Sequence, residues 1–422
     1  MRSAFPPIGA AALRAMAVAL LLVAVVHTSV GMSAMLASDD SRTFLVAPRV
    51  AAAGGSPYDA AQMHDAFAAW TGRARVVFPF MYPPPFVLMT SWVCLIGDFE
   101  VARLVWVAVN VGVTVALAWR LARWAGLPGW LTLAGAVLVT STRDNWYWGN
   151  VNVAVALALL EAVMQASGWW LAVGAMAKIA PVVVLASFVV RRDGRALLEF
   201  AVATGALLAA TALVFSPTLY VAFVRDALTP MLNGLYTAPM PRLDDPDNAS
   251  LSNLLSLLGP GATPQTLSPT GGALHRIAVV GMTLALAWES RREGRGQLGS
   301  LRIAGGYGAV MILAAPVAWN THLVLALPAL AQAWRVLAPE RGRRRAWAFG
   351  ALFLPFVVPS AWLRESYYLL PPVGAVRAVA VLALYALCLR GRIAPSAGVG
   401  SGVQGAGLSP TMSQPPAVSS AS

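Results

Sequence analysis

The sequence predicts an all-α, polytopic membrane protein, and two features of its composition carry this prediction. Of its 422 residues, 58% are hydrophobic and 11% are charged, whereas an ordinary soluble domain carries about 25% charged residues. The hydrophobic residues form long runs, and a backbone in lipid must satisfy its own hydrogen bonds, so the runs are expected to be helices. We expect about eleven or twelve transmembrane helices with long outer loops.

The charge distribution indicates topology rather than a nucleic-acid partner. Thirty Lys and Arg against 18 Asp and Glu give a net charge of +12. The arginines cluster at the ends of apolar runs, as in 191–195 and 341–345, which is typical of cytoplasmic loops and of contact with anionic membrane lipids. No nucleic acid is expected as a partner. The two cysteines lie in apolar runs, so the sequence supports neither a disulfide framework nor a metal site.

The first element is the apolar run 15–36, which two arginines precede. This charge places the N-terminus in the cytoplasm and predicts a retained first helix. The run leads into an outer loop of about 37–80, where the adjacent carboxylates Asp39 and Asp40 stand where the helix meets water. A short helix at the membrane interface is expected within 43–53.

Ten further apolar runs complete the transmembrane domain, which is expected to cover 1–393. Lys178 lies near the middle of one run and Pro181 follows it, so this run is expected to break into two short segments. A second outer loop spans about 216–272, and its length is typical of a functional loop. The tail 394–422, rich in Gly, Ser, Pro and Ala, is expected to be disordered and cytoplasmic. The expected runs are 101–121, 127–140, 153–164, 168–190, 197–215, 273–288, 303–315, 323–336, 346–359 and 373–389.

The polar residues that this topology places outside include a carboxylate, a lysine, a histidine and several amides. A carboxylate can take a proton from an acceptor hydroxyl, and cations and donors can stabilise a phosphate leaving group. This combination fits glycosyl transfer from a lipid-linked sugar phosphate, a donor consistent with the lack of nucleotide-binding motifs in the sequence. Each residue also has a structural interpretation, as a helix cap or as a partner within the protein. The set comprises Asp39, Asp40, 145–152, Lys178, 244–248 and His322.

Six short motifs follow one another along 40–330. They are Asp40 with Arg49, Gly54-Gly55 and Pro57-Tyr58-Asp59, then Tyr82-Pro83-Pro84, Gly149-Asn150-Val151-Asn152, Lys178 with Pro181, Asn248-Ala249-Ser250-Leu251, and Pro316 with Trp319 and His322. The series resembles the polyprenyl-phosphate-mannose-dependent mannosyltransferases of glycosyltransferase family 87, which have the GT-C membrane fold. The chain departs from the family pattern at Asn150, Ala318 and Thr321, and these departures bear on the substrate more than on the fold.

The resemblance implies a glycosyltransferase that moves a sugar, mannose in alpha-1,2 linkage, from a polyprenyl-phosphate donor to a glycolipid or polysaccharide acceptor. The reaction would invert the sugar carbon and take place on the outer face of the bacterial cytoplasmic membrane. Asp40 would be the general base, while His322 and Lys178 would bind the donor phosphate. No metal is implied, and no cofactor beyond the lipid-linked donor. The residues implied to position substrate are Asp39, Tyr82, Asn150, Asn152, Asn248 and Trp319.

Three alternatives stay open from the sequence. The same family includes arabinofuranosyl transfer from a polyprenyl phosphate, so the donor sugar is not fixed. A lipid or solute transporter usually shows broken helices at matching positions of two halves, and here one broken run is found without a matching partner. The altered motifs would also suit a membrane protein that has lost catalysis.

Overall fold

A computed structural model gives the conformation of most of the chain, and every regular element that it describes is helical, as the sequence predicts. The described residues up to 390 belong to one compact unit. Asp39, most of the first apolar run and the tail 394–422 lie outside the described residues, so the expectations for them and the domain boundary at 393 stay predictions. The described residues are 40–75, 77–232, 243, 245, 247–256, 267–292, 297–337, 342–359 and 375–390, with isolated positions between 15 and 26.

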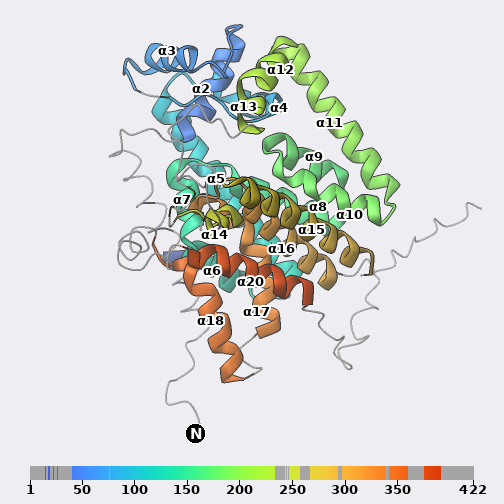
Figure 1. The fold of residues 1–422 in the computed structure, drawn as a ribbon. Helices are drawn as coiled ribbons and strands as arrows, with labels where there is room; N and C mark the ends of the chain where they lie inside the picture. Colours follow the sequence, from blue (N-terminus) through green and yellow to red (C-terminus); the bar gives the residue numbers. More distant parts are fainter. Residues whose placement is uncertain are drawn as a thin grey trace, which may run out of the picture. The chain divides into compact units, whose positions relative to one another are not determined.

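The helices of the first outer loop, α2 (Asp40–Ala52), α3 (Ala60–Thr71) and α4 (Pro84–Thr90), pack together at one end of the compact unit (Figure 1). Helix α2 begins at Asp40, earlier than expected, and most of its residues are buried within the protein. Its expected place at the membrane interface stays a prediction. One reason for the burial is Phe44, which packs edge-on against Tyr82 with 4.9 Å between ring centroids. Prolines begin α4, because a helix start needs no donor from its first residues.

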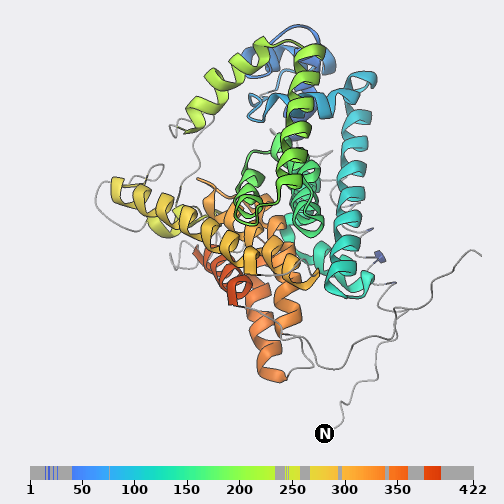
Figure 2. The ribbon, with the colours of Figure 1, turned by 90° about the vertical axis from the view of Figure 1, so that its right-hand side faces the viewer.

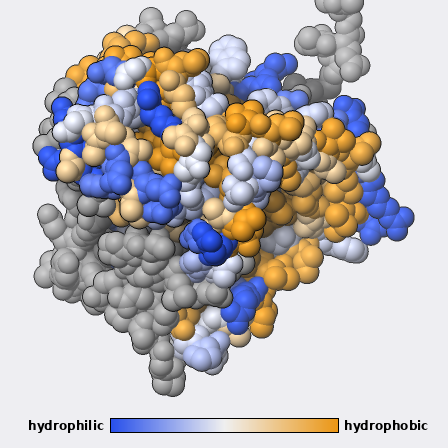
Figure 3. Space-filling view, turned by 90° about the horizontal axis from the view of Figure 1, so that it is seen from above, coloured by the Kyte–Doolittle hydropathy of each residue, from blue (hydrophilic) through white to orange (hydrophobic). Residues whose placement is uncertain are grey.

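Three of the described helices are long and apolar enough to cross a membrane by themselves: α5 (Phe99–Ala125), α11 (Gly194–Val214) and α15 (Pro269–Arg292). Figure 2 shows α5 and α11 as long upright helices. Helix α11 exposes large apolar side chains such as Leu198 and Leu213, and hydrophobic surface is densest on the side where α11 lies (Figure 3). This exposure suits contact with lipid. The expected total of eleven or twelve crossings stays a prediction.

Several apolar runs are broken into short helices, and these breaks carry polar residues. The run around Lys178 divides into α9 (Gly168–Ala177), η2 (Ala180–Val184) and α10 (Leu185–Val190), which confirms the predicted break. The polar stretch that follows the short helix α6 (Gly129–Leu138) is also helical, as α7 (Thr140–Trp148).

Helix α16 (Gln297–Ala314) lies at the centre of the core and is buried from Leu301 to Leu313. It packs against α8 (Asn152–Gln165), α15, α17 (Leu327–Leu337) and α20 (Val376–Arg390). Gly308 makes one of these contacts close, because a methyl group there would lie 2.1 Å from the Leu325 carbonyl oxygen. The remaining elements are η1 (Ser91–Leu95), α12 (Thr218–Ala222), η3 (Phe223–Leu228), α13 (Thr229–Leu232), α14 (Leu251–Ser256), η4 (Asn320–Ala326) and α18 (Arg343–Val357).

Candidate functional site

Five of the predicted site residues form one continuous line of hydrogen bonds. Asn150 Nδ2 donates to Asp40 Oδ2 at 2.6 Å, and Asn150 Oδ1 accepts from the Asn152 backbone N–H at 3.2 Å. Lys178 Nζ lies 2.8 Å from Asn152 Oδ1 and 2.7 Å from His322 Nε2. A carboxylate is thus joined to a cation and an imidazole through two amides that come from one turn of the chain.

The Asp40 end of this line depends on Gly149, which ends α7 with a φ of 71°. A methyl group on Gly149 would lie 2.5 Å from Ser41 Cβ, so only glycine lets this turn touch the start of α2. Trp106 Nε1 fixes the turn by donating to the Gly149 carbonyl at 2.7 Å. Asp40 itself stands in the first turn of α2, where the helix dipole favours a negative charge.

The cationic end of the line depends on the break after α9. Lys178 has an extended backbone (φ −158°, ψ 127°), and Pro181 in η2 has no N–H with which the helix could continue. The interruption turns Lys178 toward Asn152, whose side chain is fully buried at the start of α8. A lysine inside an apolar protein needs such polar partners.

The contact between Lys178 and His322 fixes the state of the imidazole. A lysine ammonium is only a donor, so His322 Nε2 accepts its proton and a neutral ring carries its own proton on Nδ1. His322 Nδ1 and Asn152 Nδ2 are both buried and have no hydrogen-bond partner among the described residues. Unpaired buried donors cost free energy, and an anion bound beside Lys178 would supply their missing acceptors.

Tyr82 lies close to Asp40, and its predicted role toward substrate stays a prediction. Burial first, and then the negative charge of Asp40, raise the pKa of Tyr82, so its hydroxyl stays protonated. The ring packs on Phe44 of α2, and the Tyr82 carbonyl accepts from Tyr58 Oη at 3.0 Å. Tyr58, from the predicted Pro-Tyr-Asp motif, therefore supports Tyr82.

Asn248 is not part of the line of hydrogen bonds from Asp40 to His322. Its side chain is fully buried, donates to the Leu243 carbonyl at 2.9 Å and accepts from the Ala318 N–H at 3.0 Å. It thereby joins the second outer loop to the segment that precedes His322, and its predicted role toward substrate stays a prediction. Trp319 directly precedes η4 and is 39% exposed.

A family model described as glycosyltransferase family 87 matches residues 80–316, more than half of the chain. The chain belongs to glycosyltransferase family 87. A curated relative, the polyprenol-phosphate-mannose-dependent alpha-(1-2)-phosphatidylinositol mannoside mannosyltransferase of Mycolicibacterium smegmatis, is 27% identical over 67% of each chain. No solved structure matches this chain.

Membership of family 87 makes the protein a membrane glycosyltransferase, so the transporter alternative is set aside. The matched residues include Tyr82, Asn150 and Lys178, whereas Asp40 and His322 lie outside the match. The hydrogen bonds of the structure join both of these residues to the matched part.

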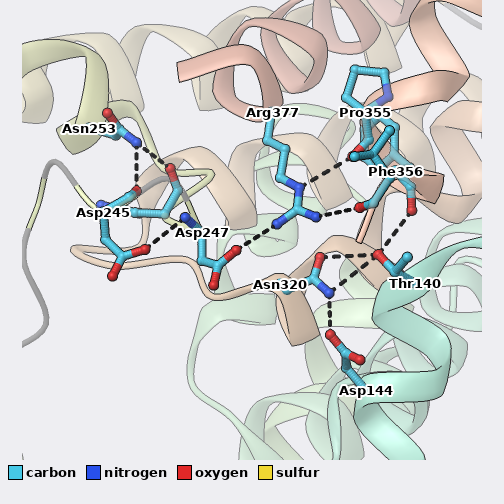
Figure 4. A network of polar contacts seen from close by, with 11 residues as sticks. Thr140, Asp144, Asp245, Asp247, Asn253, Asn320, Pro355, Phe356 and Arg377 are labelled. Carbon is cyan, nitrogen blue, oxygen red and sulfur yellow. Dashed lines mark hydrogen bonds and ion pairs between the residues drawn. The ribbon is translucent and has the colours of Figure 1, made fainter. Parts of the chain in front are cut away.

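Sequence reasoning missed a second polar network, which joins α7, α20, the second outer loop and Asn320 at the start of η4 (Figure 4). Asn320 donates to Asp144 on α7, and Arg377 on α20 binds Asp247 of the second outer loop at 3.0 Å. Burial raises the pKa of Asp144, although Asn320 partly offsets this effect. A signal was present in the sequence, because an arginine in an apolar run requires a partner.

No group of three or more His, Cys, Asp or Glu side chains in the described part of the chain is placed to hold a metal ion. The expectation that the reaction uses no metal stays a prediction.

Proposed function

We propose that this family 87 transferase moves mannose from a polyprenyl-phosphate donor to a glycolipid acceptor on the outer face of the bacterial cytoplasmic membrane. The observation that carries the proposal is the line of hydrogen bonds from Asp40 to His322. It holds a carboxylate and a cation in one polar site. The hydroxyl acceptor requires the carboxylate as a base, and the sugar phosphate donor requires the cation. The name of the mycobacterial relative supports mannose and alpha-1,2 linkage.

In the proposed step, an acceptor hydroxyl oxygen attacks the anomeric carbon of mannose. Asp40 takes the hydroxyl proton, the new carbon–oxygen bond forms, and the bond from the sugar to the polyprenyl phosphate breaks with its electron pair leaving on the phosphate. One displacement inverts the anomeric carbon, so no second carboxylate nucleophile is needed. The Asn150 amide holds Asp40 in orientation for this transfer.

Lys178 and His322 would bind the departing phosphate. The lysine supplies a positive charge, and the His322 Nδ1 and Asn152 Nδ2 donors can turn to phosphate oxygens as the negative charge develops. This arrangement gives the site its own electrostatic stabilisation, so the proposal includes no metal, nucleotide or other cofactor. Tyr82 and Asn152 would help to position the reacting groups.

Charge supports the outward orientation. The start of α18 carries Arg343, Arg344 and Arg345, which the positive-inside rule assigns to the cytoplasm. Helices α2 to α4 lie at the opposite end of the compact unit from this start of α18 (Figure 1). The Asp40 end of the site would therefore face outside, where a lipid-linked sugar donor needs no nucleotide.

The test measures transfer of labelled mannose from polyprenyl-phosphate-mannose to membrane glycolipids, with wild-type protein and with Asp40→Asn. We expect a loss of at least about 100-fold in Asp40→Asn, because the general base is removed while the side chain keeps its shape. Asp98→Asn is the matched control, since Asp98 caps α5 by accepting from the Val101 N–H and asparagine caps equally well.

Three outcomes would contradict parts of this proposal. Undiminished transfer by Asp40→Asn would remove Asp40 as the base. Transfer of arabinofuranose but not mannose, tested with the corresponding polyprenyl-phosphate donor, would replace the donor sugar. A polysaccharide product in place of a labelled glycolipid would change the acceptor class.

A further inference from the structure

Arg377 is a fully buried charged group that the proposed chemistry does not use. It lies at the start of α20, outside the part of the chain that matches the family model, and its side chain is fully buried. A buried arginine is costly unless its donors meet acceptors. Its acceptors show which parts of the chain it joins.

The guanidinium of Arg377 binds two separate segments (Figure 4). Nη1 donates to Asp247 Oδ1 at 3.0 Å, which anchors the second outer loop. Nε donates to the Pro355 carbonyl at 3.2 Å, and Nη2 donates to the Val358 carbonyl at 2.9 Å, which anchors the end of α18. The planar fork of arginine can make these bonds together, whereas a lysine ammonium is a single compact charge.

Both anchored segments are linked by further hydrogen bonds to the residues just before His322. Beyond Asp247, the Ala249 N–H donates to the Ala318 carbonyl at 2.8 Å and Asn248 accepts from the Ala318 N–H. Next to Pro355, the Phe356 carbonyl accepts from Thr140 Oγ1 at 3.1 Å.

Thr140 Oγ1 in turn bonds the side chain of Asn320, two residues before His322. Helix α7 adds a third tie, since Asn145 Nδ2 donates to the Thr321 carbonyl at 2.7 Å. The segment 316–322 is therefore held on one side by Arg377-anchored groups, while His322 reaches Lys178 on the other.

We propose that Arg377 is a positioning residue for the transferase site: it docks the second outer loop and the end of α18 onto the segment 316–322, and thereby holds His322 against Lys178. This inference rests on the proposed function in one respect, namely that His322 and Lys178 bind the donor phosphate. In this proposal Arg377 acts through His322 and not on the substrate itself.

The diagnostic variant is Arg377→Lys, which keeps the charge and loses the fork. Its matched control is Arg302→Lys, because Arg302 is equally buried, binds the Cys388 and Leu389 carbonyls at the other end of α20, and pairs with Glu289 at 3.3 Å. Both variants should weaken a buried cluster that involves α20, and the hydrogen bonds traced above lead from the cluster of Arg377 to the segment 316–322.

The first measurement is hydrogen exchange in the full-length protein without donor. Arg377→Lys should raise the exchange rate of the backbone amides of 317–322 about tenfold, while Arg302→Lys leaves it unchanged. If Arg377→Lys does not fold, Asp247→Asn takes its place, because it removes the anchoring charge and keeps the side-chain shape. Unchanged exchange in 317–322, or an equal increase from Arg302→Lys, would overturn the inference.

The second measurement separates positioning from loss of folded protein. Arg377→Lys should raise the KM for the donor about tenfold and leave the KM for the acceptor unchanged, whereas a smaller folded fraction lowers only the apparent kcat. In a His322→Ala background the same change should alter the donor KM by less than about twofold, because its effect acts through His322. If Arg377→Lys raised the donor KM about tenfold in the His322→Ala background as well, the two effects would be independent and the inference would be overturned. If the wild-type protein transfers no mannose, the proposed function is refuted. The exchange measurement then still decides whether Arg377 holds the segment 316–322 in place.

Discussion

Gly149→Ala offers a sharp test of how the Asp40 end of the site is built. The new methyl group would lie 2.5 Å from Ser41 Cβ and 3.1 Å from Ser41 Cα. Carbon atoms in contact stand about 3.5–4.0 Å apart, so the start of α2 must move by about 1 Å. Asp40 directly precedes Ser41 and would move away from Asn150.

Gly149→Ala should lower both the stability of the fold and the rate of catalysis, by different amounts. A non-glycine residue at this positive φ costs about 1–2 kcal/mol of stability, and overpacking adds about 1–3 kcal/mol. A displacement of about 1 Å in a catalytic group can lower the rate about 100-fold. Catalysis should therefore suffer far more than folding.

Gly126→Ala is the matched control, since Gly126 ends α5 with a φ of 66° and a methyl group there would meet nothing within 4 Å. It carries the same backbone strain without the clash. The assay compares kcat for mannose transfer and the thermal unfolding midpoint of both variants. Adding Ser41→Gly to Gly149→Ala removes Ser41 Cβ, which is the nearest atom. Gly149→Ala should therefore lower kcat about tenfold less in the Ser41→Gly background than in the wild-type background. A kcat for Gly149→Ala equal to that of Gly126→Ala would refute the reasoning.

Two further predictions concern charged groups. Lys178→Met removes the proposed phosphate cation and should raise the KM for the donor about 10–100-fold with an unchanged KM for the acceptor; equal changes in both would contradict the assignment. Burial raises the pKa of Asp144 in the folded protein, so its ionised form destabilises the fold as the pH rises through that pKa. Asp144→Asn should therefore unfold a few degrees above wild type at pH 8, by roughly 2–4 °C, and this gain should vanish toward pH 4; a gain independent of pH would show that another cause dominates.

The sequence alone predicted the helical class and the break at Lys178, and it named the five residues that the structure joins by hydrogen bonds. These features are local or compositional: apolar runs must be helices in lipid, a proline ends a helix, and short motifs keep their order along the chain. The burial of the helix in the first outer loop was not predicted, because its own sequence does not show that Phe44 packs into an aromatic cluster around Tyr82.

The tertiary structure decided which polar groups meet. The contact between Asp40 and Asn150 depends on Gly149 and Ser41 touching, and the bond between Lys178 and His322 depends on the break after α9 facing η4. Arg377 was only an arginine in an apolar run until its acceptors on Asp247, Pro355 and Val358 were known. Local chemistry sets which conformations a segment adopts, whereas the close approach of distant segments is set by the packing of the whole core, which no single stretch of sequence contains.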